Sequence, residues 1–343
     1  MGMRDEILEQ PAVARRLLER AREPIAAIAD AVRRREPPFA VIAARGTSDH
    51  AAIYAQYALG VRVGLPVALA APSIVSLYGA EPRYAGGLVI GVSQSGASPD
   101  VVSVVELGRR QGAITVAITN DPTSALAAAA EHVVDLSAGA ERAVAATKTY
   151  TAELVALAML VAELDGSGTG TLDGIPDRMG QALETEPEVR RIAADQVAVD
   201  RCILLGRGYQ YATAREWALK LKELTYVLAD PYSAADFLHG PLALVSPSIP
   251  VLAVAPSGAT VADTDTLLRR LRDQHDARLL VLSDVAAMRE LGTWSLPLPA
   301  DVPEWLLPLV AIVPGQLHAY HLTLAKGLDP ETPRHLRKVT LTR

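Results

Sequence analysis

The chain has 343 residues, of which 50% are hydrophobic and 21% are charged, and its formal net charge is −6. This length predicts two domains that can each bury a core, and the composition excludes a disordered chain. The acidic balance disfavours general binding of nucleic acid or of an acidic membrane. The single cysteine, Cys202, excludes an internal disulfide framework and a cysteine-based zinc cluster, and we expect it to be a buried core thiol.

The N-terminal region and the most apolar stretch both indicate a protein without a membrane segment. Residues 1–35 mix Glu and Arg with Leu, Ile and Ala at helical spacing, and they contain no apolar signal core. The most apolar stretch, residues 305–313, is too short for a membrane span and contains Pro308. We therefore expect a cytoplasmic protein that binds neither a membrane nor nucleic acid.

Short apolar runs alternate with helical patterns along the whole chain. The expected strands cover residues 39–44, 88–92, 114–119, 132–136, 201–205, 250–255, 278–283 and 295–298. The expected crossover helices include residues 48–59, 99–111 and 149–164. This alternation predicts an α/β fold in which doubly wound parallel sheets are flanked by helices.

The two halves of the chain repeat each other at an offset of 162 residues, the separation of Arg45 and Arg207. The same offset aligns residues 89–98 with residues 251–260. Matches that recur in order at one offset predict a duplicated α/β unit. The Ser-Gln pair at 93–94 is replaced in the second copy, so we expect only the first copy to keep a polar loop there.

The glycine-rich stretch around residues 165–170 is the best candidate for a linker between the copies. We predict five segments in chain order: an N-terminal helical segment (1–35), a first subdomain (36–165), a linker (166–180), a second subdomain (181–330) and a C-terminal segment (331–343).

Two polar loops, residues 44–49 and 93–98, follow expected strands of the first copy. In an open parallel sheet, ligands bind at the carboxyl ends of the strands. The glycines of these loops permit tight turns, and their hydroxyl and N–H groups suit a phosphate at a helix N-terminus. The alternative is that Ser and Thr only cap the following helices. No dinucleotide or Walker motif occurs there, so a phosphorylated small molecule is favoured over a nucleotide.

Three charged residues share one face of an expected helix in the second copy. Glu216, Lys220 and Glu223 are spaced i, i+4 and i+7, a pattern that suits acid–base chemistry. The alternative is a solvated face with a weak ion pair. The apolar neighbours, which include Trp217, argue against full solvation.

Three histidines are candidates for chemistry. His239 precedes Gly240 and Pro241, where it is placed either as a proton shuttle or as a structural turn residue. His318 and His321 are spaced i, i+3 on an expected helix, but no carboxylate or thiol at matching spacing supports a metal site. We expect these two histidines to be packing residues.

Several motifs, taken together and in order, resemble the sugar isomerase (SIS) family over nearly the whole chain. They are Gly-Thr-Ser at 46–48, Ser-Gln-Ser-Gly at 93–96, Val-Ala-Ala-Thr-Lys at 144–148, Ala-Leu-Lys-Leu-Lys-Glu at 218–223 and His-Gly-Pro-Leu-Ala-Leu at 239–244. They look like the isomerase half of glucosamine-6-phosphate synthase. The resemblance implies two tandem flavodoxin-like SIS subdomains, a homodimer with a shared active site, a phosphorylated sugar as substrate, and no cofactor or metal.

The resemblance also implies a set of substrate-binding residues. They are Gly46, Thr47, Ser48, Ser93, Gln94, Ser95, Ser98, Val144 and Ala146. Phosphate is expected on the serines and Gln94, with Val144 and Ala146 near the sugar. The synthase has serine where this chain has Ala146, so one sugar contact is expected to be missing or replaced.

The catalytic roles come from the same resemblance. It implies that Glu223 moves a proton between C1 and C2 of the sugar, with Glu216 and Lys220 as charged helpers. His239 matches the histidine that opens the sugar ring, which the neighbouring subunit supplies in the family. Lys338 matches a C-terminal lysine that can form an imine with a ketose.

Two observations favour a deaminase over a glutamine-dependent synthase. The synthase needs a glutaminase domain with a terminal cysteine nucleophile, and we expect neither in this chain. Phe-Leu-His-Gly-Pro at 237–241, Arg-Gly-Thr-Ser-Asp-His at 45–50 and Lys-Val-Thr at 338–340 look more like stand-alone glucosamine-6-phosphate deaminases. The alternatives are a galactosamine-6-phosphate deaminase, a fructosamine-6-phosphate deglycase and a non-catalytic sugar-phosphate sensor.

Overall fold

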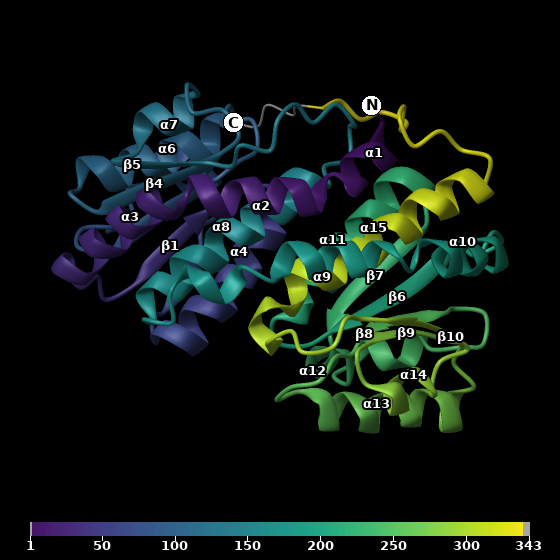
Figure 1. Cartoon of the computed structure of the whole chain (residues 1–343). Coiled ribbons are helices and arrows are strands. Elements are labelled where there is room, and N and C mark those ends of the chain that lie inside the picture. The colour runs from purple at the N-terminus through teal and green to yellow at the C-terminus, as the bar shows by residue number, and fades with distance from the viewer. Residues whose placement is uncertain (1, 339–343) are drawn as a thin grey trace. The chain divides into compact units, whose positions relative to one another are not determined.

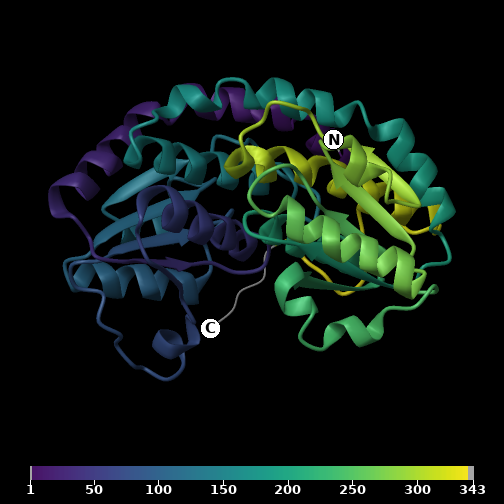
Figure 2. The same cartoon turned by 90° about the horizontal axis from the view of Figure 1, so that it is seen from below.

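The computed structural model describes residues 2–338 and divides the chain into two compact units. The N-terminal unit consists of residues 9–141, 148–176 and 337–338. The C-terminal unit consists of residues 2–8, 142–147 and 177–336. Each unit contains one five-stranded parallel sheet with helices on both faces (Figures 1 and 2).

The sheet of the N-terminal unit has the strand order β2-β1-β3-β4-β5. Its strands are β1 (Ala40–Ala43), β2 (Val67–Leu69), β3 (Leu88–Val92), β4 (Ile114–Thr119) and β5 (His132–Asp135). β1 pairs with β3 from Ala40 opposite Leu88 to Ala43 opposite Gly91. All the pairings are parallel, and the residues of β1, β3 and β4 are buried on both faces, as expected for a sheet covered by helices.

The helices of the N-terminal unit form a layer on each face of its sheet. They are α2 (Gln10–Arg20), α3 (Arg22–Arg35), α4 (Thr47–Ala58), η1 (Leu59–Val63), α5 (Ser73–Ser76), α6 (Pro99–Arg110), α7 (Ala125–Ala129), α8 (Lys148–Leu164) and η2 (Thr169–Leu172). α2, α3 and α4 pack against α8, whose residues are almost all buried. On the other face, valines of α6 and Leu126 of α7 form a core with alternate residues of β1, β3 and β4.

The C-terminal unit repeats this topology. Its strands are β6 (Arg201–Gly206), β7 (Leu228–Ser233), β8 (Val251–Val254), β9 (Leu279–Ser283) and β10 (Trp294–Pro297), in the order β10-β9-β8-β6-β7. Counted within each copy, both sheets have the order 2-1-3-4-5 of doubly wound flavodoxin-like folds. The predicted fold class and its duplication are therefore confirmed.

The helices of the C-terminal unit are arranged in the same way. They are α1 (Met3–Leu8), α9 (Ile175–Leu183), which begins at the unit boundary, α10 (Glu186–Asp195), α11 (Gln210–Thr225), α12 (Ala234–Phe237), η3 (Pro241–Leu244), α13 (Val261–His275), α14 (Ala286–Arg289), η4 (Glu304–Leu306) and α15 (Leu307–Ala325). α12, α13 and α14 enclose one core with the sheet, and α10 and α11 pack on α15. No helix within residues 2–338 is long and apolar enough to span a membrane.

Two edge strands, β2 and β7, were not expected from the sequence. β2 has only three residues, and none of them is buried. β7 contains Asp230 and Pro231, which interrupt any apolar run. Both strands lie at the same edge of their copies, where solvent exposure removes the hydrophobic signal.

His318 of α15 is buried and His321 is half-buried, and their contacts agree with the expected structural role. Trp217 Nε1 donates to Nδ1 of the buried His318, and His318 Nε2 lies 2.9 Å from Gln196 Oε1. His321 lies 2.8 Å from Glu186, which also binds Arg4. Within the described residues no group of His, Cys, Asp and Glu is suited to hold a metal.

The expected core thiol is confirmed, since Cys202 is buried at the start of β6. Burial raises the pKa of this thiol to about 12. The thiolate is therefore not formed near neutral pH, which makes Cys202 an inert packing residue.

The buried His318 predicts a pH-dependent contribution to stability. Burial lowers the pKa of His318 from 6.5 to about 3, so the folded protein keeps this imidazole neutral. Its contribution is fully present above pH 6.5 and is lost as the pH falls toward 3, at up to about 1.4 kcal/mol per pH unit. Urea unfolding between pH 7 and 5 should show a smaller loss for His318→Gln than for the wild type. The exposed control His239→Gln should behave like the wild type, and identical slopes for all three proteins would contradict the assignment.

Candidate functional site

The two polar loops of the first copy lie where its strand order reverses. One loop follows β1 and the other follows β3, and these neighbouring strands carry their next helices, α4 and α6, on opposite faces. This topological switch point is where open α/β sheets bind ligands. Gly96 adopts φ +60°, and a Cβ there would lie 2.0 Å from Ser124 Oγ, so the second loop requires glycine.

The serines of the second loop are not used to cap helix α6. Ser98 occupies the N-cap position of α6, but in the described structure its side chain makes no capping hydrogen bond. Ser124, in contrast, accepts a hydrogen bond from Ala127 and caps α7. Ser93 Oγ accepts from Gly96 N at 3.2 Å, and Ser95 Oγ accepts from Ala97 N at 3.3 Å. These contacts shape the loop itself and do not support the alternative in which Ser98 only caps a helix.

An ion pair with one buried partner connects the two loops of the first copy. Arg45 follows β1, and its guanidinium lies 2.7 Å from the Asp100 carboxylate in the first turn of α6. The Asp100 side chain is fully buried, whereas that of Arg45 is 44% exposed. The second copy repeats the pair with Arg207 and Asp263 at 2.8 Å. The pair therefore belongs to the duplicated scaffold and fixes the relative position of the loops in each copy.

In the second copy, carboxylates of the same chain accept hydrogen bonds from the corresponding loop. Asp284 accepts hydrogen bonds from Ser257 N at 2.7 Å and from Ser257 Oγ at 2.5 Å. Glu304 accepts from Ala259 N at 3.0 Å, and a Cβ on Gly258 would collide with the Glu304 side chain. These internal anions occupy the donors that a phosphate would need. The N–H and hydroxyl donors of the second loop are therefore bound within the chain, and ligand binding by the first loop stays a prediction.

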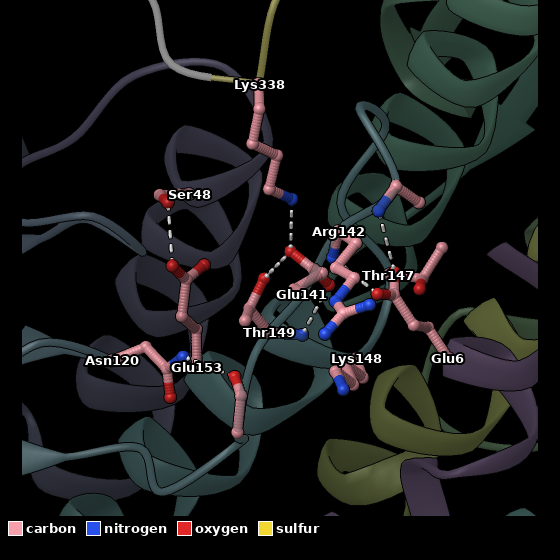
Figure 3. Close-up of polar contacts among 12 residues, drawn as sticks. Glu6, Ser48, Asn120, Glu141, Arg142, Thr147, Lys148, Thr149, Glu153 and Lys338 are labelled. Carbon is pink, nitrogen blue, oxygen red and sulfur yellow. Dashed lines mark hydrogen bonds and ion pairs between the residues drawn. The ribbon is translucent and has the colours of Figure 1, made fainter. Parts of the chain in front are cut away.

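Ser48 makes a contact that limits what it can offer a ligand. Its hydroxyl donates to Glu153 Oε1 at 2.7 Å, and both residues are buried (Figure 3). Glu153 lies on α8, which packs against the α4 helix that carries Ser48. Because the single hydroxyl hydrogen is directed to Glu153, Ser48 presents only an acceptor to a ligand. An acceptor suits a sugar hydroxyl or an ammonium group better than a phosphate dianion.

Lys338 also belongs to the N-terminal unit, where it pairs with a buried glutamate. Its Nζ lies 2.8 Å from Glu141 Oε2, and Thr149 binds the same carboxylate through its N–H and hydroxyl groups (Figure 3). The sequence interpretation missed both Glu141 and Glu153. Residues 339–340 of the Lys-Val-Thr motif lie outside the described residues.

The loop that carries Val144 and Ala146 belongs to the C-terminal unit, and both side chains are half-buried. The buried carboxylate of Glu6 on α1 accepts hydrogen bonds from Arg142 N at 2.5 Å and from Ala143 N at 3.3 Å. At the other end of the loop, Gln316 donates to the carbonyl of Thr147 at 3.3 Å. Buried polar groups of two helices thus hold this loop in place.

The charged residues of α11 form a largely buried cluster. Lys220 Nζ lies 2.6 Å from Glu223 and 3.3 Å from Glu216. The side chains of Lys220 and Glu216 are fully buried, whereas that of Glu223 is 22% exposed. Burial lowers the pKa of Lys220, but the carboxylates of Glu216 and Glu223 outweigh burial and raise it above its usual value. The cluster is therefore not a solvated face, and Glu223 is its accessible member.

His239 lies in an exposed turn between α12 and η3. Its backbone N–H donates to the Asp236 carbonyl at 3.0 Å, and Gly240 follows with φ +138°. An exposed imidazole is available to another molecule.

The structure therefore gathers the predicted residues in two groups. The N-terminal unit holds the loops at 46–48 and 93–98 together with Lys338. The C-terminal unit holds the α11 cluster, the loop at 144–146 and His239. Within the N-terminal unit, α8 carries contacts of both carboxylates that the sequence did not predict. Its Thr149 binds Glu141, and its own Glu153 binds Ser48.

Comparison with known proteins explains this duplicated arrangement. The model of the SIS domain family matches residues 37–163 and again residues 198–324. The chain belongs to the SIS domain family. The two SIS domains coincide with the two copies of the sheet and confirm the expected repeat.

Two groups of relatives show which SIS proteins this chain is similar to. A Gloeobacter violaceus glutamine–fructose-6-phosphate aminotransferase (isomerizing) is 37% identical over 311 residues, which cover 87% of this chain and 51% of that protein. The chain thus spans about half the length of this relative. The structure of a protein provisionally assigned as a phosphosugar isomerase from Silicibacter pomeroyi is 35% identical, with a TM-score of 0.87 over 96% of this chain and 99% of the other.

A third relative is the C-terminal domain of glucosamine-fructose-6-phosphate aminotransferase from Francisella tularensis. It is 28% identical, with a TM-score of 0.84 over 96% of this chain and 98% of that domain. The similarity covers both SIS domains.

The Arg45–Asp100 pair should contribute measurably to the stability of the SIS scaffold. Arg45→Met leaves the buried Asp100 carboxylate without its cation, and we expect unfolding free energy to fall by about 1–3 kcal/mol, given the partial exposure of Arg45. The matched control is Arg110→Met, which removes an exposed pair with Glu81 and should cost less than about 1 kcal/mol. Denaturant unfolding measures both, and equal losses would contradict the structural role of the pair.

Proposed function

We propose that the chain is an enzyme that acts on phosphorylated sugars and converts glucosamine 6-phosphate into fructose 6-phosphate and ammonia. The observation that carries this proposal is the α11 cluster, in which Lys220 lies between two carboxylates and only Glu223 has an accessible side chain. A general base must be ionised, oriented and within reach of substrate. The similarity to SIS proteins named for sugar phosphates supports the same class of substrate.

The N-terminal SIS domain is proposed to bind the phosphate. The loop at 93–98 supplies hydroxyl and N–H groups at the start of α6, and Asp284 and Glu304 occupy the corresponding donors of the second copy. Ser48 is proposed to accept a hydrogen bond from a sugar hydroxyl or from the amino group, because its own hydrogen is directed to Glu153. Gly46, Thr47, Gln94, Val144 and Ala146 complete the proposed binding set.

The proposed reaction needs only proton transfers and water. Ring opening, assigned to the exposed His239 of a neighbouring subunit, gives an open-chain aldehyde. Glu223 removes the proton at C2 while the C1 oxygen gains a proton, which gives an enolamine. A proton is then delivered to C1 while the amino nitrogen loses one, which gives a C2 imine. Water adds to the imine and ammonia leaves, which yields fructose 6-phosphate. Glu216 and Lys220 orient the base by their contacts within α11.

The remaining features of the proposal follow the family resemblance. They are a homodimer with a shared active site, location in the cytoplasm, a substrate-facing role for Lys338, and subdomain boundaries at the linker 166–180. In the structure this linker contains η2 and the start of α9.

Ammonia release tests the proposed activity. Wild type should release ammonia from glucosamine 6-phosphate, and Glu223→Gln should lower kcat by about 10²- to 10⁴-fold, because the amide cannot accept the C2 proton. The exposed control Glu188→Gln, which lies outside the site, should retain the wild-type rate.

A substrate panel decides among the alternatives. Ammonia release from galactosamine 6-phosphate, or breakdown of a fructosamine 6-phosphate, in place of glucosamine 6-phosphate would reassign the substrate. If every turnover assay stays silent while fructose 6-phosphate raises the melting temperature, the protein is a sensor and the proposal is wrong.

The contact between Ser48 and Glu153 predicts a separation of sugar binding from phosphate binding. Glu153→Gln introduces an amide that can donate to Ser48, so the Ser48 hydroxyl no longer presents only an acceptor to the ligand. We expect KM for the sugar phosphate to rise about 2- to 10-fold, while the inhibition constant of inorganic phosphate stays unchanged. Steady-state kinetics with Ser48→Ala as the companion variant measures this. A changed phosphate constant would place Ser48 on the phosphate instead.

A further inference from the structure

Glu141 is a buried carboxylate to which neither the sequence motifs nor the proposed proton transfers assign a role. Its side chain is fully buried, and both of its oxygens are engaged. Thr149 N donates to Oε1 at 3.1 Å, Thr149 Oγ1 donates to Oε2 at 2.6 Å, and Lys338 Nζ donates to Oε2 at 2.8 Å (Figure 3). A carboxylate held by the first turn of a helix has a fixed orientation and a favourable interaction with the helix dipole.

Helix α8 places this carboxylate beside the contact that orients Ser48. Thr149, which binds Glu141, and Glu153, which binds Ser48, are spaced i, i+4 on α8. Residues at this spacing share one face of a helix, and their Cβ atoms are about 6 Å apart. Residues on one face of α8 therefore bind both the Gly-Thr-Ser loop and, through Glu141, the ammonium of Lys338, and Figure 3 draws both contacts.

We propose that Glu141 is a positioning residue that holds Lys338, so that the Lys338 ammonium is presented next to the Gly-Thr-Ser loop at 46–48 of the first SIS domain. Glu141 acts through Lys338 and does not itself touch the substrate. The consequence for catalysis rests on the proposed function, whereas the docking contact does not.

The ion pair joins two residues that are far apart in the sequence. Lys338 lies 197 residues from Glu141 in the sequence, and the side chain of Lys338 is 24% exposed. The neighbouring side chains of Leu336 and Arg337 are exposed. A fully buried carboxylate left without its cation is unfavourable, so the pair favours the docked position of Lys338.

Competitive acylation of lysines tests the docking contact without any substrate. The protein is treated with limiting acetic anhydride, and mass spectrometry reports the acylation rate of Lys338 relative to that of the exposed Lys222. Glu141→Gln should raise the relative rate at Lys338 by about tenfold or more, and Thr149→Val, which removes one anchor of the carboxylate, should raise it less. The rate at Lys326, which donates to the carbonyls of Val197 and Val199, should stay unchanged as an internal control.

A double-mutant cycle tests the consequence for catalysis. If Glu141 acts through Lys338, then Glu141→Gln combined with Lys338→Met should be no slower than Lys338→Met alone, because the second change removes an interaction that is already lost. Glu141→Asp should recover part of kcat/KM, which a role in fold stability alone does not predict. Melting temperatures identify any variant that fails to fold. If Glu141→Gln is such a variant, the loss of kcat/KM in Lys338→Met measures the contribution of the pair.

Each outcome has a distinct meaning. An unchanged acylation rate in Glu141→Gln overturns the docking contact. A raised rate together with additive kinetic losses overturns the link between docking and catalysis. If no sugar phosphate is turned over, the proposed function fails, and the acylation rates alone decide whether Glu141 holds Lys338.

Discussion

In each copy, the loop that follows the third strand has N–H donors that need hydrogen-bond acceptors. The two SIS domains supply these acceptors in different ways. In the second copy, Asp284 and Glu304 supply fixed negative charges to the loop, which leaves no room for a phosphate. In the first copy, the hydroxyls of Ser93 and Ser95 accept from the loop instead, and they carry no charge. A neutral loop at a helix N-terminus attracts an anion, whereas a loop already filled with carboxylates repels one. One scaffold thus carries a loop without internal carboxylates in the first copy and a loop bound by two carboxylates in the second.

Most of the fold could be predicted because its signal is local. Buried parallel strands appear as apolar runs, and the repeat at an offset of 162 residues independently predicted a duplicated α/β unit. β2 was not predicted because it has only three residues, none of them buried, and β7 was not predicted because Asp230 and Pro231 interrupt its apolar pattern. Pro308, expected as an interruption, lies in the first turn of α15, where its missing N–H costs no hydrogen bond.

The site could be predicted where its residues share one helix or one motif. Glu216, Lys220 and Glu223 are in register on α11, so their spacing alone predicted their meeting. Glu141 and Glu153 lie outside the recognised motifs, and each has a partner far away in the sequence. Ser48 is 105 residues from Glu153, and such pairs become visible only when α4 and α8 are packed together. The donor role expected for Ser48 did not take account of this partner.

The course of the backbone between the two units has a consequence for dissecting the protein. Residues 2–8 belong with residues 177–336, and the short loop 142–147 joins the same unit because Glu6 and Gln316 hold its backbone. The chain thus passes between the units at five points. No single cut yields either unit as a continuous polypeptide, and removal of the first helix would release a loop encoded more than 130 residues downstream. Each SIS domain has its own sheet, but each unit is built from several separate segments of the chain.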